Sequence, residues 1–332
     1  MSVIVSGAGI AGVATAHRLA TKYGLKNVTV VDRFSPLSMT SAVSTECFRN
    51  VWSNRKMSEL ANLSIDILEN LSKQSDNYFN MSHRGYVYVT KSKELANDFQ
   101  DLADSSSDFD AYVGKDKCLG RFPFVSSESV GALHAKRAGW LDAQQLGQYM
   151  IQEAKEAGVK FTLGDITRVD AFESHVKVQI DKKTNLEASY FVNASGPWTN
   201  AMNERIFDCR KDLKHSLSPL PLQNELHAKI ILHDELGLIP RDIPMIICAD
   251  EIELPWDDET REFLRETKPK YLQRLPSGLH LRPSSTDGYV FTLWDFVHQH
   301  VVISDPPPHT LEPHMYDEWY VEIVLRGLAC TS

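Results

Sequence analysis

The glycines near the start of the chain have the spacing of a loop that holds a dinucleotide. They form the pattern GxGxxG, and the strand that follows closes on an acid, Asp32. In such a loop the first glycine permits a tight turn, the second leaves room for a pyrophosphate, and the third lets a helix lie close to a strand. Phosphate oxygens would accept hydrogen bonds from amides at the positive end of that helix, and Asp32 would bind a ribose diol. The loop residues that we expect to contact a cofactor are Gly7, Gly9, Ile10, Ala11 and Gly12.

Three elements must position this loop. A β-branched run ends at Ser6, apolar residues recur with helical spacing from Val13 to Tyr23, and a second β-branched run spans residues 27–32. GxGxxG indicates dinucleotide binding in this context of strand, turn, helix, strand and acid, whereas the pattern alone also occurs at ordinary strand-to-helix corners. Because the pattern does not distinguish flavin from nicotinamide, an NAD-dependent dehydrogenase is an alternative.

The loop after Asp32 is rich in small hydroxyl side chains and basic residues. Hydroxyl groups in such a loop can bind phosphate and ribityl oxygens, although each is also typical of turns and helix caps. The candidate cofactor-binding residues of this segment are Arg33, Ser41, Ser44, Thr45 and Arg49.

A later part of the chain has the pattern of an α/β unit that ends in a corner of small residues. Asp142 caps a helix predicted over residues 143–157, a parallel strand follows at 159–162, and residues 164–193 alternate like a meander of three strands. Small residues after Asn193 would let the backbone approach a cofactor closely. The candidates in this corner are Ala194, Ser195, Gly196 and Trp198.

Together these segments resemble the family of D-amino acid oxidase, glycine oxidase and sarcosine oxidase, over nearly the whole chain. In that family a small-hydroxyl loop and an Asn-Ala-x-Gly-x-Trp corner surround FAD, so the resemblance implies FAD as the cofactor. It also implies an α/β fold in which a doubly wound, Rossmann-like FAD-binding domain with a β-meander is interleaved with an α+β substrate domain built on a mixed sheet. The expected ranges are 1–78 and 139–205 for the FAD-binding domain, and 79–138 and 206–332 for the substrate domain.

The second half of the chain adds one further candidate. Segments that begin at Leu254, Leu275 and Val324 resemble substrate-domain strands of sarcosine-oxidase-like members. Alternation places His280 and Arg282 on one face of a strand. Arg282 could receive a substrate carboxylate through two parallel hydrogen bonds, or it could be a solvated residue of the strand face.

The reaction that the resemblance implies is oxidation of the C–N bond of an amino acid or secondary amine, with hydride transfer to flavin N5. Arg49 would act electrostatically on the flavin edge and Arg282 would hold the substrate carboxylate, so both are catalytic candidates. The partners would be a small amine or amino-acid substrate and an electron acceptor, either oxygen or a respiratory carrier. A flavoprotein without turnover that assists assembly of respiratory complex I is an alternative.

Composition excludes several other classes of protein. The net charge is -9 and the basic residues form no long run, which argues against nucleic-acid binding. No stretch approaches the roughly 20 apolar residues that span a bilayer. The five cysteines include no CxxC pair, which favours a reducing compartment and no structural zinc. We expect no metal at His298, His300 or His309. A strand at the very start leaves no room for a signal peptide, so a cytoplasmic or organellar location is expected.

The end of the sequence departs from the family pattern. Members of the family continue past a sequence like that of residues 325–329 with a glycine-rich strand and a final helix that closes the cofactor domain. By that comparison we expect this chain to lack the C-terminal closing segment.

Overall fold

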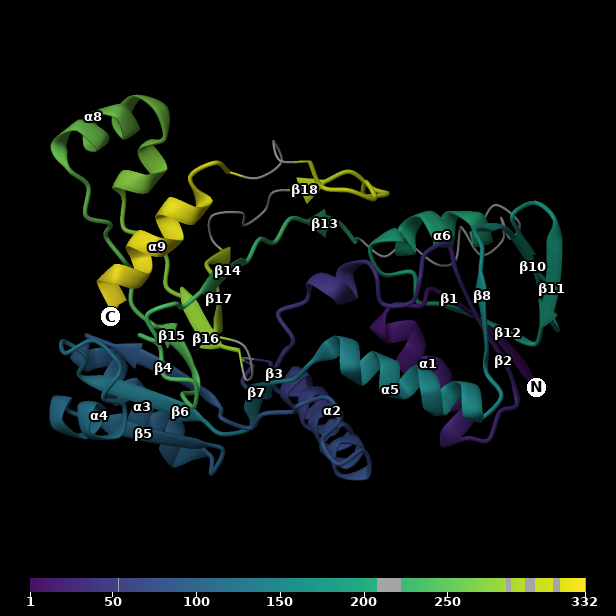
Figure 1. The fold of residues 1–332 in the computed structure, drawn as a ribbon, viewed down its shortest axis with the longest axis horizontal. Coiled ribbons are helices and arrows are strands. Elements are labelled where there is room, and N and C mark those ends of the chain that lie inside the picture. Colours follow the sequence, from purple (N-terminus) through teal and green to yellow (C-terminus); the bar gives the residue numbers. More distant parts are fainter. Residues whose placement is uncertain (53, 208–221, 285–287, 296–301, 313–316, 332) are drawn as a thin grey trace.

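Two β-sheets organise the computed structural model, which describes residues 1–332 except 53, 208–221, 285–287, 296–301, 313–316 and 332. A parallel sheet lies at one end of the molecule and a mixed sheet at the other, with helix α2 (Arg55–Gln74) between them (Figure 1). The predicted α/β fold class is confirmed.

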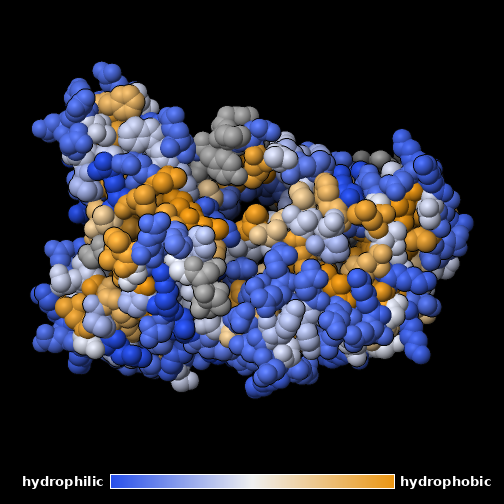
Figure 2. Space-filling view, in the orientation of Figure 1, coloured by the Kyte–Doolittle hydropathy of each residue, from blue (hydrophilic) through white to orange (hydrophobic). Residues whose placement is uncertain are grey.

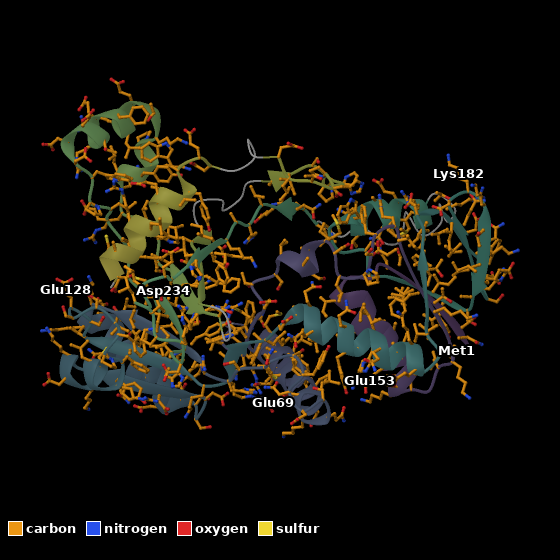
Figure 3. All side chains as sticks on the ribbon, viewed as in Figure 1. Met1, Glu69, Glu128, Glu153, Lys182 and Asp234 are labelled. Carbon is orange, nitrogen blue, oxygen red and sulfur yellow. The ribbon has the colours of Figure 1, made fainter. Side chains whose placement is uncertain are left out.

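The parallel sheet carries the amino-terminal loop at its centre. Its strand order is β12-β1-β2-β8. Val3 and Val5 of β1 pack on the side of helices α1 and α5, while Ile4 faces the opposite side, so the sheet is covered on both faces. His17 of α1 contacts Glu153 of α5 at 2.8 Å and thereby joins the two helices; Figure 3 labels Glu153. The elements are β1 (Ser2–Ser6), β2 (Asn27–Asp32), β8 (Lys160–Leu163), β12 (Tyr190–Asn193), α1 (Ile10–Thr21) and α5 (Ala143–Glu156).

An antiparallel meander covers the second face of the parallel sheet. It consists of β9 (Ile166–Ala171), β10 (Val176–Ile180) and β11 (Thr184–Ala188), with helix α6 (Thr199–Phe207) beside β9. The predicted meander of three strands is therefore confirmed, but its range was too long, because β12 leaves the meander and pairs in parallel with β1. The strand predicted at residues 27–32 is confirmed, and the first helix begins at Ile10 rather than at Val13.

The mixed sheet has the strand order β14-β17-β16-β15-β4-β6-β5. Strands β4 and β15 pair in parallel, and the other neighbours are antiparallel. Its strands come from the two ranges expected for the substrate domain, whose boundaries stay a proposal. They are β4 (Tyr86–Thr90), β5 (Phe109–Val113), β6 (Gly131–Ala135), β14 (Ile230–His233), β15 (Met245–Cys248), β16 (His280–Pro283) and β17 (Tyr289–Leu293).

Short elements and helices complete the described chain. Two-stranded ribbons are formed by β3 (Cys47–Arg49) with β7 (Ala138–Trp140) and by β13 (Asn224–Glu225) with β18 (Val302–Ile303). Helices α3 (Lys93–Ser105) and α4 (Lys115–Arg121) lie by β5 and β6, and single 3-10 turns are η1 (Thr40–Val43), η2 (Gly196–Trp198) and η3 (Pro269–Leu272). Among the helices described, none is both long and apolar enough to cross a membrane.

Two of the three segments expected to be substrate-domain strands are not strands: the segment from Leu254 leads into a helix, and the segment from Val324 lies within one. The Asp257 side chain accepts a hydrogen bond from Thr260 N at 2.8 Å and thereby starts helix α8 (Asp258–Thr267) after Leu254. In helix α9 (Tyr320–Thr331) the buried residues recur with helical spacing. The strand prediction, which rested on the family resemblance, did not take this spacing into account. Of the three, only the segment after Leu275 contains a strand, β16.

An ionised aspartate joins η3 to the chain just before α9. Burial alone would raise the pKa of Asp317. Hydrogen bonds from Tyr271 Oη at 2.6 Å and from Trp319 N, together with the ammonium groups of Lys268 and Lys270, outweigh this effect and lower the pKa to about 2. A lowered pKa adds stability that is complete above the unfolded value near 3.8 and is lost as the pH falls through about 2.

We expect Asp317→Asn to lower the thermal midpoint at pH 7 and to have a smaller effect as the pH approaches 2. Thermal unfolding of both proteins across that range measures the difference, with the exposed Asp101→Asn as the matched control. A difference between Asp317→Asn and wild type that does not shrink in acid would contradict the role of the ionised carboxylate.

Candidate functional site

The glycines of the amino-terminal loop differ in what surrounds them. Gly7 has φ +103°, and a Cβ atom there would lie 2.3 Å from Ala194 O. A Cβ atom on Gly12 would lie 1.9 Å from Gly7 O, so both positions are closed by the protein's own backbone. At Gly9 the nearest atom is Ser41 Oγ at 3.4 Å, and the space beyond opens into a cavity that Gly9 lines. The packing of the chain therefore requires Gly7 and Gly12, whereas the missing side chain of Gly9 leaves room for a ligand.

Asp32 fixes the loop to the end of β2. Its Oδ2 accepts a hydrogen bond from Ala8 N at 2.6 Å, and its Oδ1 accepts one from Phe34 N at 2.9 Å. An ionised carboxylate has about four acceptor positions, so both oxygens keep capacity for a ligand hydroxyl. Asp32 lines the same cavity as Gly9.

The corner after β12 meets the loop from the neighbouring strand. Ala194 N donates to Ser6 O at 2.8 Å, and the hydroxyl groups of Ser6 and Ser195 lie 2.9 Å apart. Gly196 has φ +56°, which a residue with a side chain rarely adopts, and it begins the turn η2 that carries Trp198. This corner therefore lies against the glycine loop because β1 and β12 are adjacent parallel strands.

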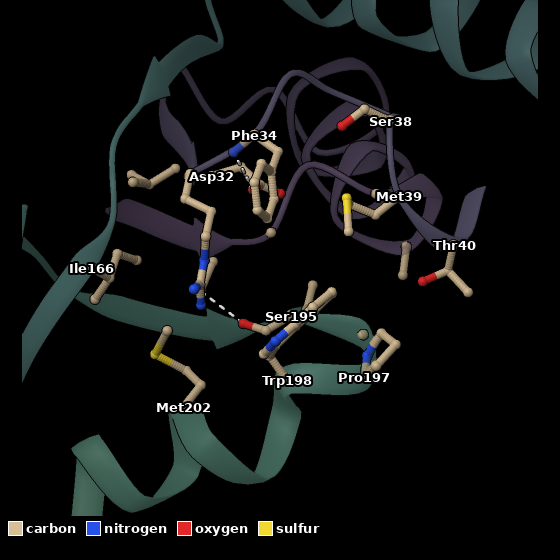
Figure 4. A pocket seen from close by; sticks show the side chains of 18 of the residues that line it. Asp32, Phe34, Ser38, Met39, Thr40, Ile166, Ser195, Pro197, Trp198 and Met202 are labelled. Carbon is tan, nitrogen blue, oxygen red and sulfur yellow. Dashed lines mark hydrogen bonds between the residues drawn. The ribbon is translucent and has the colours of Figure 1, made fainter. Parts of the chain in front are cut away.

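Rings and an arginine gather at the edge of this cavity. The Arg33 guanidinium lies 5.8 Å from the Trp198 ring, and the His309 ring stacks on Trp198 with centroids 5.5 Å apart. Phe34 packs edge-on against His309 at 5.1 Å. In Figure 4 Phe34 and Trp198 approach the cavity from opposite sides. The sequence analysis considered His309 only as a metal ligand and did not predict this stacking.

Most of the candidate cofactor residues surround this first cavity, whose volume is about 240 Å³. Gly12 lies behind Gly7, and Ser44 Oγ instead accepts a hydrogen bond from Glu46 N at 2.9 Å. The candidates that line the first cavity are Gly7, Gly9, Ile10, Ala11, Asp32, Arg33, Ser41, Ala194, Ser195, Gly196 and Trp198.

A second, larger cavity of about 710 Å³ is bordered by the mixed sheet and helix α2, and the candidates Thr45 and Arg49 line it. Ser41 lines the first cavity while Val43 and Thr45 line the second, so residues 41–45 lead from one to the other. The molecular surface is hollowed between the two halves of the molecule in Figure 2. The sequence analysis did not identify Tyr86, Tyr88 or Lys229 as wall residues of this cavity.

The polar groups of the second cavity include aromatic hydroxyls and two cations. Arg49 Nη1 lies 3.5 Å from Tyr88 Oη, and its guanidinium lies 4.7 Å from the Trp52 ring. Burial raises the pKa of Tyr88 against the opposing charge of Arg49, so the phenol stays neutral near pH 7. Burial also lowers the pKa of His280, whose Nδ1 lies 2.8 Å from Gly278 O.

Arg282 lies behind this cavity rather than in its wall. Its Nη2 donates to Glu46 Oε2 at 3.1 Å and to Thr45 O at 3.0 Å, and its side chain is 4% exposed. It borders a small adjoining cavity of about 10 Å³. A role for Arg282 as receptor of a substrate carboxylate stays a prediction, and the geometry gives its guanidinium a carboxylate of the protein instead. Glu46 was not among the candidates, because no local pattern indicates its pairing with a residue so far along the chain.

Histidines, cysteines and acids do not gather into a metal site within the described ranges, in which no group of three or more such residues was found. His298 and His300 lie outside the described residues, as does Cys209. The cysteines described, Cys47, Cys118, Cys248 and Cys330, are free thiols.

A comparison with known protein families matches residues 2–294 to the family described as FAD dependent oxidoreductase. Because the match covers most of the chain, the protein belongs to that family. FAD is therefore its cofactor. The open position at Gly9, the amino end of α1 and the acceptor Asp32 around one cavity fit the dinucleotide part of this group.

Solved structures share the fold at low sequence identity. L-proline dehydrogenase from P. horikoshii has a TM-score of 0.72 and 16% identity, over 99% of this chain and 76% of that chain. Glycine oxidase from Bacillus cereus ATCC 14579 has a TM-score of 0.66 and 15% identity, over 99% and 77%. Iminodiacetate oxidase from Chelativorans sp. BNC1 has a TM-score of 0.63 and 13% identity, over 99% and 80%. A search of the curated proteins found no match.

Proposed function

We propose that the protein oxidises the C–N bond of an amino acid or secondary amine. The observation that carries this proposal is the second cavity, because residues 41–45 connect it to the first cavity and its wall includes the cations Arg49 and Lys229. A substrate that has both a nitrogen to be oxidised and a negative charge to be held fits such a wall. The names of the similar structures, which include a glycine oxidase, a proline dehydrogenase and an iminodiacetate oxidase, support the same class of substrate.

When bound, FAD would supply the two-electron acceptor for a hydride from the carbon next to the substrate nitrogen. The substrate must enter this step as the neutral amine, and it leaves as an imine after its nitrogen has lost a proton. The imine is then hydrolysed by water. The protein's part is to bind the substrate, orient it and keep bulk water away.

The residues of the second cavity are suited to that part. Phe48, Ile65 and Leu68 supply apolar wall, and Tyr86 is 4% exposed, so this region is shielded from bulk water. Arg49 places a fixed positive charge in the wall, which stabilises negative charge that develops nearby during the reaction. His280, with its lowered pKa, is neutral near pH 7 and adds no competing charge.

The proposal predicts that amino acids or secondary amines bleach the visible absorbance of the FAD-loaded protein under anaerobic conditions. A panel of such compounds is mixed with the holoprotein, and the matched carboxylates without nitrogen serve as controls. Bleaching by dithionite but by no amine in the panel would contradict the proposal and would favour a flavoprotein that does not oxidise amines.

A further inference from the structure

The charges of the second cavity are unevenly neutralised. Glu46 holds Arg282 through the 3.1 Å contact between Oε2 and Nη2, so the charge of that guanidinium is already compensated. Within the described part of the chain, neither Arg49 nor Lys229 forms an ion pair with a carboxylate. Asp295 also borders the cavity, but it contacts His227 at 3.1 Å and its side chain is 54% exposed. The deeper wall therefore has an excess of positive charge.

Lys229 is the more constrained of these two cations. Its Nζ donates to Ser44 O at 2.6 Å, and the Phe291 ring lies 5.2 Å away. Burial lowers the pKa of Lys229, while the charge of Glu46 partly opposes that effect. An ammonium group has three hydrogens to donate, so a further acceptor can bind beside the carbonyl. An anionic ligand would offset the cost of keeping this charge away from water.

Another part of the cavity wall is apolar and comes largely from the start of α2. Met57 is 41% and Leu60 is 57% exposed, and both border the cavity together with Trp52, which is 43% exposed. Large apolar side chains left exposed at the rim of a cavity are typical of a ligand-binding surface. Because Arg49 lies against the Trp52 ring, the cationic and apolar walls adjoin.

We propose that the substrate is an amino acid with a bulky apolar side chain, whose carboxylate binds Lys229 and Arg49 and whose side chain packs on Trp52, Met57 and Leu60. This inference rests on the proposed amine oxidation and specifies its substrate. It transfers the role of carboxylate receptor from Arg282 to two cations that have no carboxylate partner in the described chain. Substrates with a charged side chain would be disfavoured, because α2 offers that charge an apolar surface.

Ligand binding to the FAD-loaded protein tests the two walls separately. The probes are 3-phenylpropionate, which has both groups, acetate, which lacks the ring, and 2-phenylethylamine, which lacks the carboxylate. Calorimetry and the change of the flavin spectrum measure their affinities. We expect 3-phenylpropionate to bind at least ~10-fold more tightly than either of the others, which corresponds to about 1.4 kcal/mol. Equal affinities for all three would overturn the proposal.

Variants assign the contributions to residues. Lys229→Met should weaken 3-phenylpropionate binding by about 10-fold or more, as expected for a lost charge-assisted hydrogen bond, and should not weaken binding of the cation 2-phenylethylamine. Leu60→Ser, at an exposed position that folding does not need, should reduce the preference for 3-phenylpropionate over acetate. The exposed Lys93→Met is the matched control. An unchanged affinity in both cavity variants would overturn the assignment.

The experiments distinguish a failure of the substrate assignment from a failure of the proposed amine oxidation. If 3-phenylpropionate binds as expected but no amine bleaches the flavin, the binding site is supported and amine oxidation is not. If small or charged amines bleach the flavin at least as fast as leucine and phenylalanine do, amine oxidation is supported and the substrate assignment is wrong.

Discussion

Gly9→Val is expected to leave the fold intact and to weaken FAD binding by ~100-fold or more, which is about 2.8 kcal/mol. Gly9 has φ -68°, a conformation that valine adopts, and its side-chain position faces the first cavity rather than the backbone of another segment. A valine side chain would occupy space that the pyrophosphate needs. Titration of the apoprotein with FAD, followed by flavin fluorescence, measures the change.

Two further glycine variants serve as controls for Gly9→Val. Gly12→Ala should fail to give folded protein, because its Cβ atom would lie 1.9 Å from Gly7 O. Gly120→Val, in α4 with no atom within 4 Å of its Cβ position, should bind FAD like the wild type. The apoprotein of Gly9→Val should keep the thermal midpoint of the wild type. Unchanged FAD affinity in folded Gly9→Val would show that the pyrophosphate lies elsewhere.

The geometry of the glycine loop could be predicted because its information is local. The turn at Gly7, the close packing at Gly12 and the acid at the end of β2 all lie within one strand-helix-strand unit, and each leaves its own residue type at a fixed position. The corner at Ser195 was also accessible, because small residues directly follow a strand. In these segments the pattern and the structure agree to within a few residues.

The second cavity could not be predicted in the same way, because its wall is assembled from distant segments. Tyr88 lies on β4, Lys229 directly precedes β14, and Leu60 lies on α2, and no spacing in the sequence relates them. The strands expected after Leu254 and Val324 were wrong for a related reason. Resemblance suggested strands there, whereas the cap at Asp257 and the helical spacing in α9 determine the local structure.

Arg282 illustrates how a residue can be located correctly and still have an unexpected environment. Alternation placed it on a strand, and β16 contains it, but the sequence did not indicate that its guanidinium would be buried against Glu46. The backbone of Glu46 has φ +62°, its Oε1 accepts a hydrogen bond from Ala143 N at 3.2 Å, and its O accepts one from Leu141 N at 3.0 Å. These contacts hold the carboxylate in place beside the arginine.

Glu46→Ala is therefore expected to destabilise the apoprotein strongly, by about 3–5 kcal/mol, because it leaves a buried guanidinium without its carboxylate. Arg282→Met should cost less, since the Glu46 side chain is 24% exposed and water can solvate part of its charge. The Arg282 Nε atom, which has no hydrogen-bond partner among the described residues, is also removed by that change.

The double variant should be more stable than the sum of the single effects predicts, with a coupling energy of about 1–3 kcal/mol. Urea unfolding of the four apoproteins measures this cycle, and the absence of FAD keeps ligand binding from contributing. Additive effects would mean that the ion pair between Glu46 and Arg282 contributes no coupling energy to the stability of the fold.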